Sequence, residues 1–213
     1  VLCCHRRFGK TVCMINHLIK SAMTNKNHNP RLAYIAPTYS QAKKIAWDYL
    51  KHYAKNIPST KFNESELRAD FVNGARISLL SSENYDSIRG IYLDMCCVDE
   101  LAQIHQNLID EVITPALSDR KGKLFLIGTP KGMNNIFYDY YQKAQADDKW
   151  FLYKAKASDT KIVDQEELDA ALSVMGDSKY QQEFECSFVG NIVGSIYGDL
   201  VNEMEDKKQI GKK

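Results

Sequence analysis

The sequence lacks a strong excess of charge of either sign. Its 213 residues include 28 lysines and arginines against 27 aspartates and glutamates. A large basic surplus would by itself indicate nucleic-acid binding, whereas a balanced charge neither requires nor excludes DNA as a partner. Internal repeats and low-complexity tracts are also missing, which argues against repeat architectures. The length predicts one sizeable α/β core with room for a small C-terminal addition.

Long apolar runs and metal-ligand spacings are missing as well. No apolar stretch approaches the roughly 20 residues that cross a bilayer, and no leader precedes the first strand. The six cysteines have no CxxC or Cys/His spacing. These absences predict a cytoplasmic protein with buried thiols and no membrane partner. The chain begins on an apolar strand without an initial methionine, so we expect the N-terminal part of its core to be missing.

The apolar pattern predicts alternating strands and helices. Runs this apolar are typical of the middle of a mostly parallel sheet with helices on its faces. We expect strands at 1–4, 31–36, 95–98, 123–127 and 151–155, a hairpin of 66–71 and 75–80 around Asn73-Gly74, and helices at 10–23, 40–54, 107–117, 134–146, 166–175 and 178–188. In the helix at 40–54, helical spacing predicts an inward face of Ala42, Ile45, Tyr49, Leu50 and Tyr53.

A phosphate-binding loop is predicted directly after the first apolar run. It consists of His5, Arg6, Arg7, Phe8, Gly9, Lys10 and Thr11. A strand that turns through Gly-Lys-Thr into a helix presents backbone N–H groups and a helix N-terminus to phosphate. Lys10 can then reach the β- and γ-phosphates, and Thr11 can ligate Mg²⁺. The usual GxxxxGKT pattern has glycine where this chain has Cys4, so the loop indicates a nucleotide triphosphatase with an irregular phosphate site.

Polar residues follow two of the expected core strands. Asp99 is placed to hold Mg²⁺, and Glu100 can polarise an attacking water as general base. An Asp-Glu pair often only caps the next helix, but the phosphate loop upstream favours hydrolysis. Thr129, within Gly128-Thr129-Pro130, is a candidate sensor of the γ-phosphate; the alternative is an ordinary turn.

Arginines near these motifs are candidate catalytic residues, because phosphoryl transfer is catalysed mostly by charge stabilisation. Arg6 and Arg7 lie in the loop itself, where one of them can reach the γ-phosphate in cis. Arg89 precedes Gly90 and can project into the site of a neighbouring subunit; the alternative is a surface arginine beside a turn. The sequence leaves the choice between cis and trans open.

Five motifs together resemble one protein family. They are Arg6-Arg7-x-Gly-Lys-Thr, Ala36-Pro37-Thr38 with Gln41, Ser87-Ile88-Arg89-Gly90, Val98-Asp99-Glu100 and Gly128-Thr129-Pro130. In this order, over about residues 1–190, they resemble the ATPase domain of the large terminase subunit of tailed bacteriophages, in which the double-arginine loop is the usual form.

The resemblance implies a fold and a set of site residues. The fold is a three-layer α/β P-loop NTPase of the additional-strand, catalytic-glutamate type, with a small helical lid. ATP and Mg²⁺ are the implied cofactors. The implied roles are Lys10 and Thr11 on phosphates and Mg²⁺, Asp99 on Mg²⁺, Glu100 as catalytic base, Thr129 as coupling residue, and Arg6 or Arg89 as arginine finger.

The resemblance also implies partners and a division of the chain. ATP hydrolysis would drive double-stranded DNA into a procapsid, in the host cytoplasm, with the portal protein, the small terminase subunit and neighbouring copies in a homo-oligomeric ring as partners. We expect a P-loop ATPase core at 1–149, a lid or linker at 150–190, and at 191–213 a linker towards a missing nuclease domain. Nuclease activity is not expected, because a two-metal site needs carboxylates from several strands.

Two other functions remain open. Ala36-Pro37-Thr38 with a following glutamine also suits a P-loop helicase or DNA-remodelling ATPase, although little room is left for a second ATPase lobe. A non-catalytic nucleotide-binding assembly module is the other alternative, against which Glu100 argues.

Overall fold

The structure is a computed structural model that describes residues 1–189, including every side chain in that range except those of Asn84, Asp86 and Ser87. Its centre is an eight-stranded sheet in the order β3-β4-β5-β2-β6-β7-β1-β8. The strands are β1 (Leu2–Cys4), β2 (Arg31–Ala36), β3 (Lys61–Asn63), β4 (Arg68–Asp70), β5 (Arg76–Ser81), β6 (Met95–Val98), β7 (Lys123–Gly128) and β8 (Tyr153–Ala155). In this order, each strand from β5 through β2, β6, β7 and β1 to β8 pairs in parallel with the next. At the other edge, β4 pairs antiparallel with both β3 and β5.

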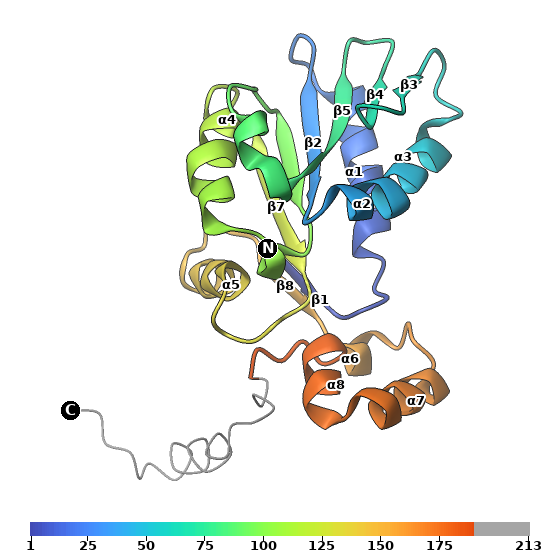
Figure 1. Ribbon diagram of the computed structural model, residues 1–213, viewed down its shortest axis with the longest axis vertical. Coiled ribbons are helices and arrows are strands. Elements are labelled where there is room, and N and C mark those ends of the chain that lie inside the picture. The colour runs from blue at the N-terminus through green and yellow to red at the C-terminus, as the bar shows by residue number, and fades with distance from the viewer. Residues whose placement is uncertain (190–213) are drawn as a thin grey trace, which may run out of the picture.

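Helices cover both faces of this sheet (Figure 1). On one face, α1 (Lys10–Thr24) and α3 (Trp47–Ala54) bury an apolar cluster that includes Ile15, Leu18 and Leu50. On the other face, η4 (Leu108–Ile113), α4 (Thr114–Ser118) and α5 (Ile136–Ala146) bury a second cluster around Ile109 and Phe137. Apolar strands buried on both faces require this three-layer arrangement, and the expected fold class is confirmed.

The helix expected at 40–54 has a different inward face from the predicted one. It runs as α2 (Tyr39–Gln41), a π-helical stretch η1 (Ala42–Ala46) and α3. The inward placement of Ile45, Tyr49 and Tyr53 is wrong, because these side chains are 49%, 38% and 38% exposed. Buried positions at a spacing of four are Ala42, Ala46, Leu50 and Ala54, and Trp47 beside Ala46 is buried as well. A π turn holds more residues than an α turn, so the buried face shifts along the sequence.

Short elements connect the main ones. The β4–β5 hairpin forms as expected, with Gly74 at φ 80° in its turn. Two further short helices flank the strand that ends at Val98, namely η2 (Ser82–Ile88) and η3 (Leu101–Gln103). All six cysteines are free; five are buried as expected and Cys13 is exposed. Within the described part of the chain, no helix is both long and apolar enough to span a bilayer.

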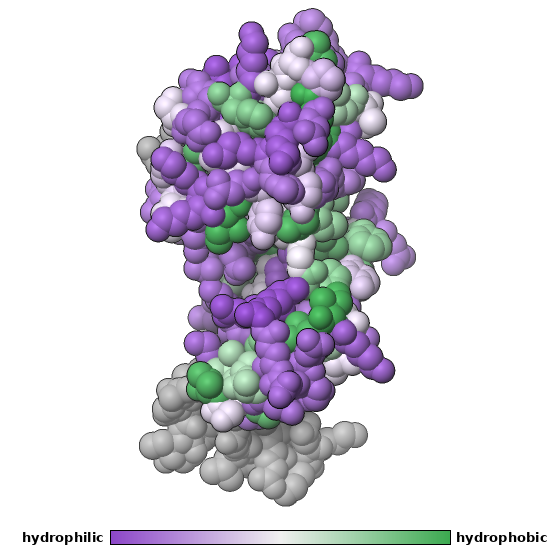
Figure 2. All heavy atoms as spheres, turned by 90° about the vertical axis from the view of Figure 1, so that its right-hand side faces the viewer, coloured by the Kyte–Doolittle hydropathy of each residue, from purple (hydrophilic) through white to green (hydrophobic). Residues whose placement is uncertain are grey.

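A group of three helices, here called the helical unit, follows β8. It consists of α6 (Ala157–Thr160), α7 (Gln165–Met175) and α8 (Asp177–Glu183), and it lies below the sheet in Figure 1. Its own apolar cluster contains four buried residues, Ala157, Val163, Leu168 and Phe184. The helix expected at 178–188 ends at Glu183. The space-filling view shows the molecule narrowing where the sheet body meets this unit (Figure 2). The linker expected at 191–213 lies outside the described residues.

Candidate nucleotide site

A pocket of about 450 Å³ opens where the phosphate loop meets the carboxyl ends of the parallel strands. This edge of an open α/β sheet is where ligands of such folds bind. The loop contributes Arg6, Arg7, Gly9, Lys10 and Thr11 to the lining. The strand ends contribute Tyr34, Asp99, Glu100 and Thr129. The lining also includes Gln41, Ile45, Tyr49, Gln103, Lys131 and Glu183, among others.

The phosphate loop turns through two residues in the left-handed region. Arg7 has φ 66° and Gly9 has φ 88°. A methyl group at Gly9 would meet no atom within 4 Å, so the backbone borders open space on that side. The helix α1 begins at the next residue, Lys10. Because the first N–H groups of a helix lack intrahelical acceptors, this end of α1 is suited to an anion.

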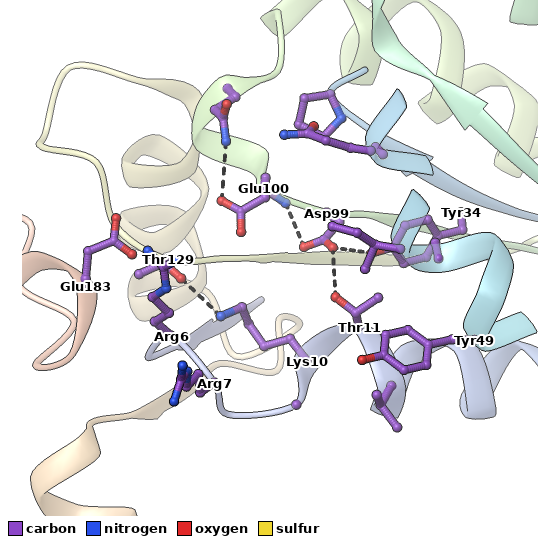
Figure 3. A pocket seen from close by; sticks show the side chains of 18 of the residues that line it. Arg6, Arg7, Lys10, Thr11, Tyr34, Tyr49, Asp99, Glu100, Thr129 and Glu183 are labelled. Carbon is purple, nitrogen blue, oxygen red and sulfur yellow. Dashed lines mark hydrogen bonds between the residues drawn. The ribbon is translucent and has the colours of Figure 1, made fainter. Parts of the chain in front are cut away.

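Lys10 crosses the loop and touches the candidate sensor. Its Nζ donates to the carbonyl oxygens of Cys4 at 2.9 Å and His5 at 3.0 Å, and to Thr129 Oγ1 at 3.0 Å. Thr129 Oγ1 donates to the Cys4 carbonyl at 3.3 Å. Figure 3 shows Lys10 pointing towards Thr129. The structure therefore brings together two residues that lie 119 positions apart in the chain.

The structure also brings Thr11 to Asp99. Thr11 Oγ1 donates to Asp99 Oδ2 at 3.2 Å, and the Glu100 backbone N–H donates to Asp99 Oδ1 at 2.8 Å. Tyr34 donates its phenolic hydrogen to Asp99 Oδ2. Burial raises the pKa of Tyr34 well above its ordinary value, and the negative charge of Asp99 acts in the same direction. The tyrosine therefore remains a donor at neutral pH.

The donor set at this end of the pocket fits Mg²⁺. Asp99 and Thr11 supply oxygen ligands, and Mg²⁺ is usually held by one or two carboxylates together with substrate phosphates and water. No group of three or more His, Cys, Asp or Glu side chains suited to a metal occurs among residues 1–189, so phosphates and water would have to complete the shell. Gln41 Oε1 is buried here without a hydrogen-bond partner from the described residues. Such an atom needs a donor from a ligand or a water.

Glu100 has the backbone and environment of a functional carboxylate. It lies at φ 49°, ψ 46°, a left-handed conformation that non-glycine residues adopt rarely and at a cost. Burial raises the pKa of the Glu100 carboxyl, Asp99 raises it further, and Lys10 opposes the shift. Gln103 Nε2 approaches Glu100 Oε2 at 3.5 Å. A pKa moved towards neutrality improves a carboxylate as a general base.

The candidate arginines lie in different places. Arg6 and Arg7 both line the pocket. Arg7 forms an ion pair with Glu167 of α7, and the Arg6 N–H donates to the Glu183 carbonyl at 2.8 Å. Arg89 is not among the lining residues described for this pocket, and its Nη2 lies 2.7 Å from Glu111 Oε2. Within one chain, the structure places only the loop arginines of these three candidates at the pocket.

His5 and Phe8 are not among the residues described as lining the pocket, which does not support their expected contact with nucleotide. His5 is fully buried, with Nδ1 at 2.6 Å from the Arg6 carbonyl and Nε2 at 2.8 Å from Thr160 Oγ1 of α6. Burial lowers the pKa of His5. Phe8 packs against the rings of His5 and Tyr153. His5 thus joins the loop to the helical unit, and Phe8 packs the loop against β8.

Sequence reasoning did not single out Tyr34, Thr160 or Glu183 as part of this site. Tyr34 carries the only polar side-chain group among the buried residues of β2. Its hydroxyl indicates a contact with the site only when β2 is known to lie beside β6. No motif marks Thr160, and the contacts of Thr160 and Glu183 with the loop are tertiary.

The chain is similar to known proteins in sequence and in fold. A family model described as "Terminase large subunit, T4likevirus-type, N-terminal" matches residues 5–200. The large terminase subunit of Thermus virus P23-45 is 31% identical over 126 residues, which cover 50% of this chain and 26% of that protein. The corresponding subunit of Thermus phage G20c is 30% identical with the same coverage. The matched part of the chain thus corresponds to about a quarter of these relatives.

Solved structures agree on the fold. The ATPase domain of the Thermus phage P74-26 large terminase superposes with a TM-score of 0.75 at 23% identity, covering 89% of this chain and 88% of that chain. The large terminase of a thermophilic bacteriophage, in complex with ADP, has a TM-score of 0.75 at 18% identity, covering 88% of this chain and 48% of that one. Because the family model covers most of the sequence, the chain belongs to the terminase large subunit family, in the part represented by its N-terminal model.

Proposed function

We propose that this chain is the ATPase motor of a terminase large subunit and that it hydrolyses ATP to drive double-stranded DNA into a procapsid. The observation that carries the proposal is the convergence of Lys10, Thr11, Asp99 and Glu100 in one pocket. Thr11 and Asp99 are 88 positions apart and share a hydrogen bond. The structures of a thermophilic bacteriophage's large terminase in complex with ADP and with ATP-γ-S support a nucleotide as the ligand.

In the proposed mechanism, the loop residues bind the triphosphate. The N–H groups at the start of α1 and the Lys10 ammonium hold its β- and γ-phosphates, while the Thr11 hydroxyl and the Asp99 carboxylate hold Mg²⁺. Mg²⁺ supplies charge neutralisation on the phosphate oxygens. Lys10 must turn part of its hydrogen bonding from the Cys4 and His5 carbonyls to phosphate.

Glu100 then accepts a proton from the attacking water, and an arginine stabilises the charge that develops on the transferred group. Arg6 is the candidate in the chain's own pocket. Arg89 can take this role only from a neighbouring subunit, because in its own chain it pairs with Glu111 away from the pocket.

Coupling of hydrolysis to movement is proposed to run through two connections. Thr129 contacts Lys10, so loss of the γ-phosphate changes the surroundings of a residue at the end of β7. The loop is bonded to the helical unit through His5 and Thr160 and through the Arg6 N–H and the Glu183 carbonyl. In this proposal, residues 1–149 are the ATPase core and 150–190 the lid or linker, within which the helical unit that follows β8 is the part whose movement shifts DNA.

The proposed partners follow from this function. They are double-stranded DNA, the portal protein, the small terminase subunit and further copies of this chain in a ring, in the cytoplasm of the host. A ring is required if Arg89 acts in trans, because an isolated chain would then lack its arginine finger.

Replacement of Glu100 by glutamine tests the proposal. The side chain keeps its size but can no longer accept a proton, so we expect Glu100→Gln to bind a fluorescent ADP analogue like the parent and to lose about 10²-fold or more of its ATP hydrolysis. Glu166→Gln, on the exposed side of α7, is the matched control and should keep full activity. A Glu100→Gln variant that hydrolyses ATP as fast as the parent would remove Glu100 as base. A parent that binds nucleotide but never hydrolyses it, with or without DNA and at any protein concentration, would favour the non-catalytic module.

A further inference from the structure

Tyr34 is a buried residue of the pocket that no motif accounts for. It lies in β2, its side chain is 1% exposed, and its hydroxyl donates to Asp99 Oδ2. The two residues are 65 positions apart in the chain. Figure 3 shows Tyr34, Asp99 and Thr11 side by side, joined by dashed hydrogen bonds.

The sheet register explains how Tyr34 reaches Asp99. β2 and β6 run in parallel, with Tyr34 opposite Cys97. Asp99 lies two residues beyond Cys97 and therefore extends to the same face of the sheet. The Asp99 N–H donates to the Ile35 carbonyl at 2.9 Å, so the pairing of the two strands continues up to this residue. A side chain as long as tyrosine spans the diagonal distance between the two positions.

The two carboxylate oxygens of Asp99 accept hydrogen bonds from different donors. Oδ1 accepts from the Glu100 N–H, and Oδ2 accepts from both Thr11 and Tyr34. The proposed metal would take the Thr11 oxygen as a ligand, which requires that hydroxyl to reorient. Tyr34 is not a proposed ligand and stays fixed in the core, so it is the side-chain contact that can hold Asp99 in one orientation with and without metal.

We propose that Tyr34 is a positioning residue, which orients Asp99 towards Mg²⁺ and thereby sets how strongly Mg²⁺ enhances nucleotide binding. The inference rests on the proposed role of Asp99. Hydrogen-bond partners behind a metal ligand fix its orientation, and their loss typically costs about 10- to 100-fold in metal affinity.

The test compares nucleotide binding with and without metal. For the 213-residue chain, the dissociation constant of a fluorescent ADP analogue is measured in excess Mg²⁺ and in EDTA, and the ratio of the two gives the Mg²⁺ enhancement. Tyr34→Phe keeps the ring and removes only the hydroxyl. We expect the enhancement to fall about 10-fold, while affinity in EDTA stays at the parent value.

Two further variants make the result specific. Tyr140→Phe also removes a tyrosine-to-aspartate hydrogen bond, the 3.3 Å bond to Asp110, but Tyr140 is not among the described lining residues of the pocket. It should keep the parent enhancement. Asp99→Asn weakens the metal ligand itself and should lower the enhancement at least as much as Tyr34→Phe.

Each contrary outcome has its own meaning. If Asp99→Asn lowers the enhancement and Tyr34→Phe does not, the positioning role is overturned and the proposed function stands. If Tyr34→Phe weakens binding equally in Mg²⁺ and in EDTA, its role is structural and the proposal is again overturned. If Mg²⁺ does not enhance binding to the parent, or Asp99→Asn leaves the enhancement unchanged, both the positioning role and the proposed metal site fail.

Discussion

The nucleotide pocket has two walls of opposite construction. The sheet wall consists of Tyr34, Asp99, Glu100 and Thr129 at the ends of β2, β6 and β7, and all but Glu100 of these are buried. The strands that carry this wall pack within two large apolar clusters, one on each face of the sheet. The helical wall consists of Arg6, Arg7 and Glu183 and the helical unit behind them, whose own cluster contains four buried residues.

The two walls are suited to different roles, the sheet wall to chemistry and the helical wall to movement. On the sheet wall, hydrogen bonds from the buried Tyr34 and from Thr11 hold the candidate metal ligand Asp99 in place, which is the arrangement that charge stabilisation requires. On the helical wall, a small cluster is joined to the loop by an exposed ion pair, a backbone hydrogen bond and the hydrogen bond between His5 and Thr160, so fewer interactions must break for it to move. The pocket therefore combines a fixed side, which carries the proposed catalytic residues, with a side that can move when the proposed nucleotide binds.

Among the changes that test this comparison of the two walls, removal of an arginine finger should have the largest effect on ATP hydrolysis. Arg6 lines the pocket of its own chain, so we expect Arg6→Ala to lower ATP hydrolysis by about 10³-fold or more at every protein concentration. Arg89 is outside that pocket, so Arg89→Ala should reduce only the activity that rises with protein concentration. Steady-state ATPase assays over a concentration series measure both.

Mixing two inactive variants separates cis from trans. Subunits with Arg89→Ala keep Glu100, and subunits with Glu100→Gln keep Arg89. If Arg89 acts in trans, an equimolar mixture regains activity that neither variant has alone. An Arg89→Ala variant that is fully active as an assembled ring would exclude Arg89 as the arginine finger and leave Arg6 as the candidate.

The acid limb of the pH profile tests the sheet wall. Because burial and Asp99 raise the pKa of Glu100, its carboxylate should become protonated at a higher pH than an ordinary glutamate, and the hydrolysis rate should fall about 10-fold per pH unit below that pKa.

The raised pKa of Glu100 also predicts an effect on stability. A group with a raised folded-state pKa stabilises the fold at low pH and loses this contribution as pH rises through that pKa. Glu100→Gln cannot ionise, so at neutral pH its melting temperature should equal or exceed that of the parent. A lower melting temperature, with the Glu166→Gln control unchanged, would contradict the cost assigned to ionising this half-buried carboxyl group.

The core strands of the sheet wall were predictable from the sequence because their signals are local. β2, β6 and β7 contain continuous apolar runs, which end before Pro37, Asp99 and Gly128 respectively. The three-residue strand β3 has no such run and was not predicted. The exposed Ile45 and Tyr49 were predicted to be buried, because an α-helical spacing was assumed where the chain forms a π turn.

The site was predictable only as far as its motifs extend. The phosphate loop and the Asp99-Glu100 pair are recognised from neighbouring residues, whereas the partners of these residues come from distant segments. Tyr34 meets Asp99 through strand order, and Thr160 meets His5 across 155 positions. His5 itself was assigned to nucleotide binding because a sequence pattern does not show on which side of a loop a side chain lies.

Loss of the Thr160 hydroxyl should loosen the helical wall. Thr160→Val keeps the shape of the side chain but leaves the buried His5 Nε2 without its 2.8 Å partner. An unpaired buried polar group costs about 1–3 kcal/mol in the free energy of unfolding, and a chain of this length then melts several degrees lower. We also expect faster hydrogen exchange in α6 and α7, with little change in β2 and β6. Thr160→Ser keeps the hydroxyl and should behave like the parent; equal behaviour of the Val and Ser variants would show that this bond does not hold the unit.

The smallest effect is expected for the ion pair between Arg7 and Glu167. Both side chains are largely exposed, at 61% and 41%, and exposed ion pairs contribute about 0–1 kcal/mol, which salt reduces further. Glu167→Ala should therefore lower the melting temperature only slightly at low ionic strength and not at all at high ionic strength. The alanine variant leaves the pocket lining intact, which makes it a cleaner probe than substitution of Arg7. A large loss of stability that persists in high salt would mean that the helical wall is held as firmly as the sheet wall, and movement of the lid would then have to begin elsewhere.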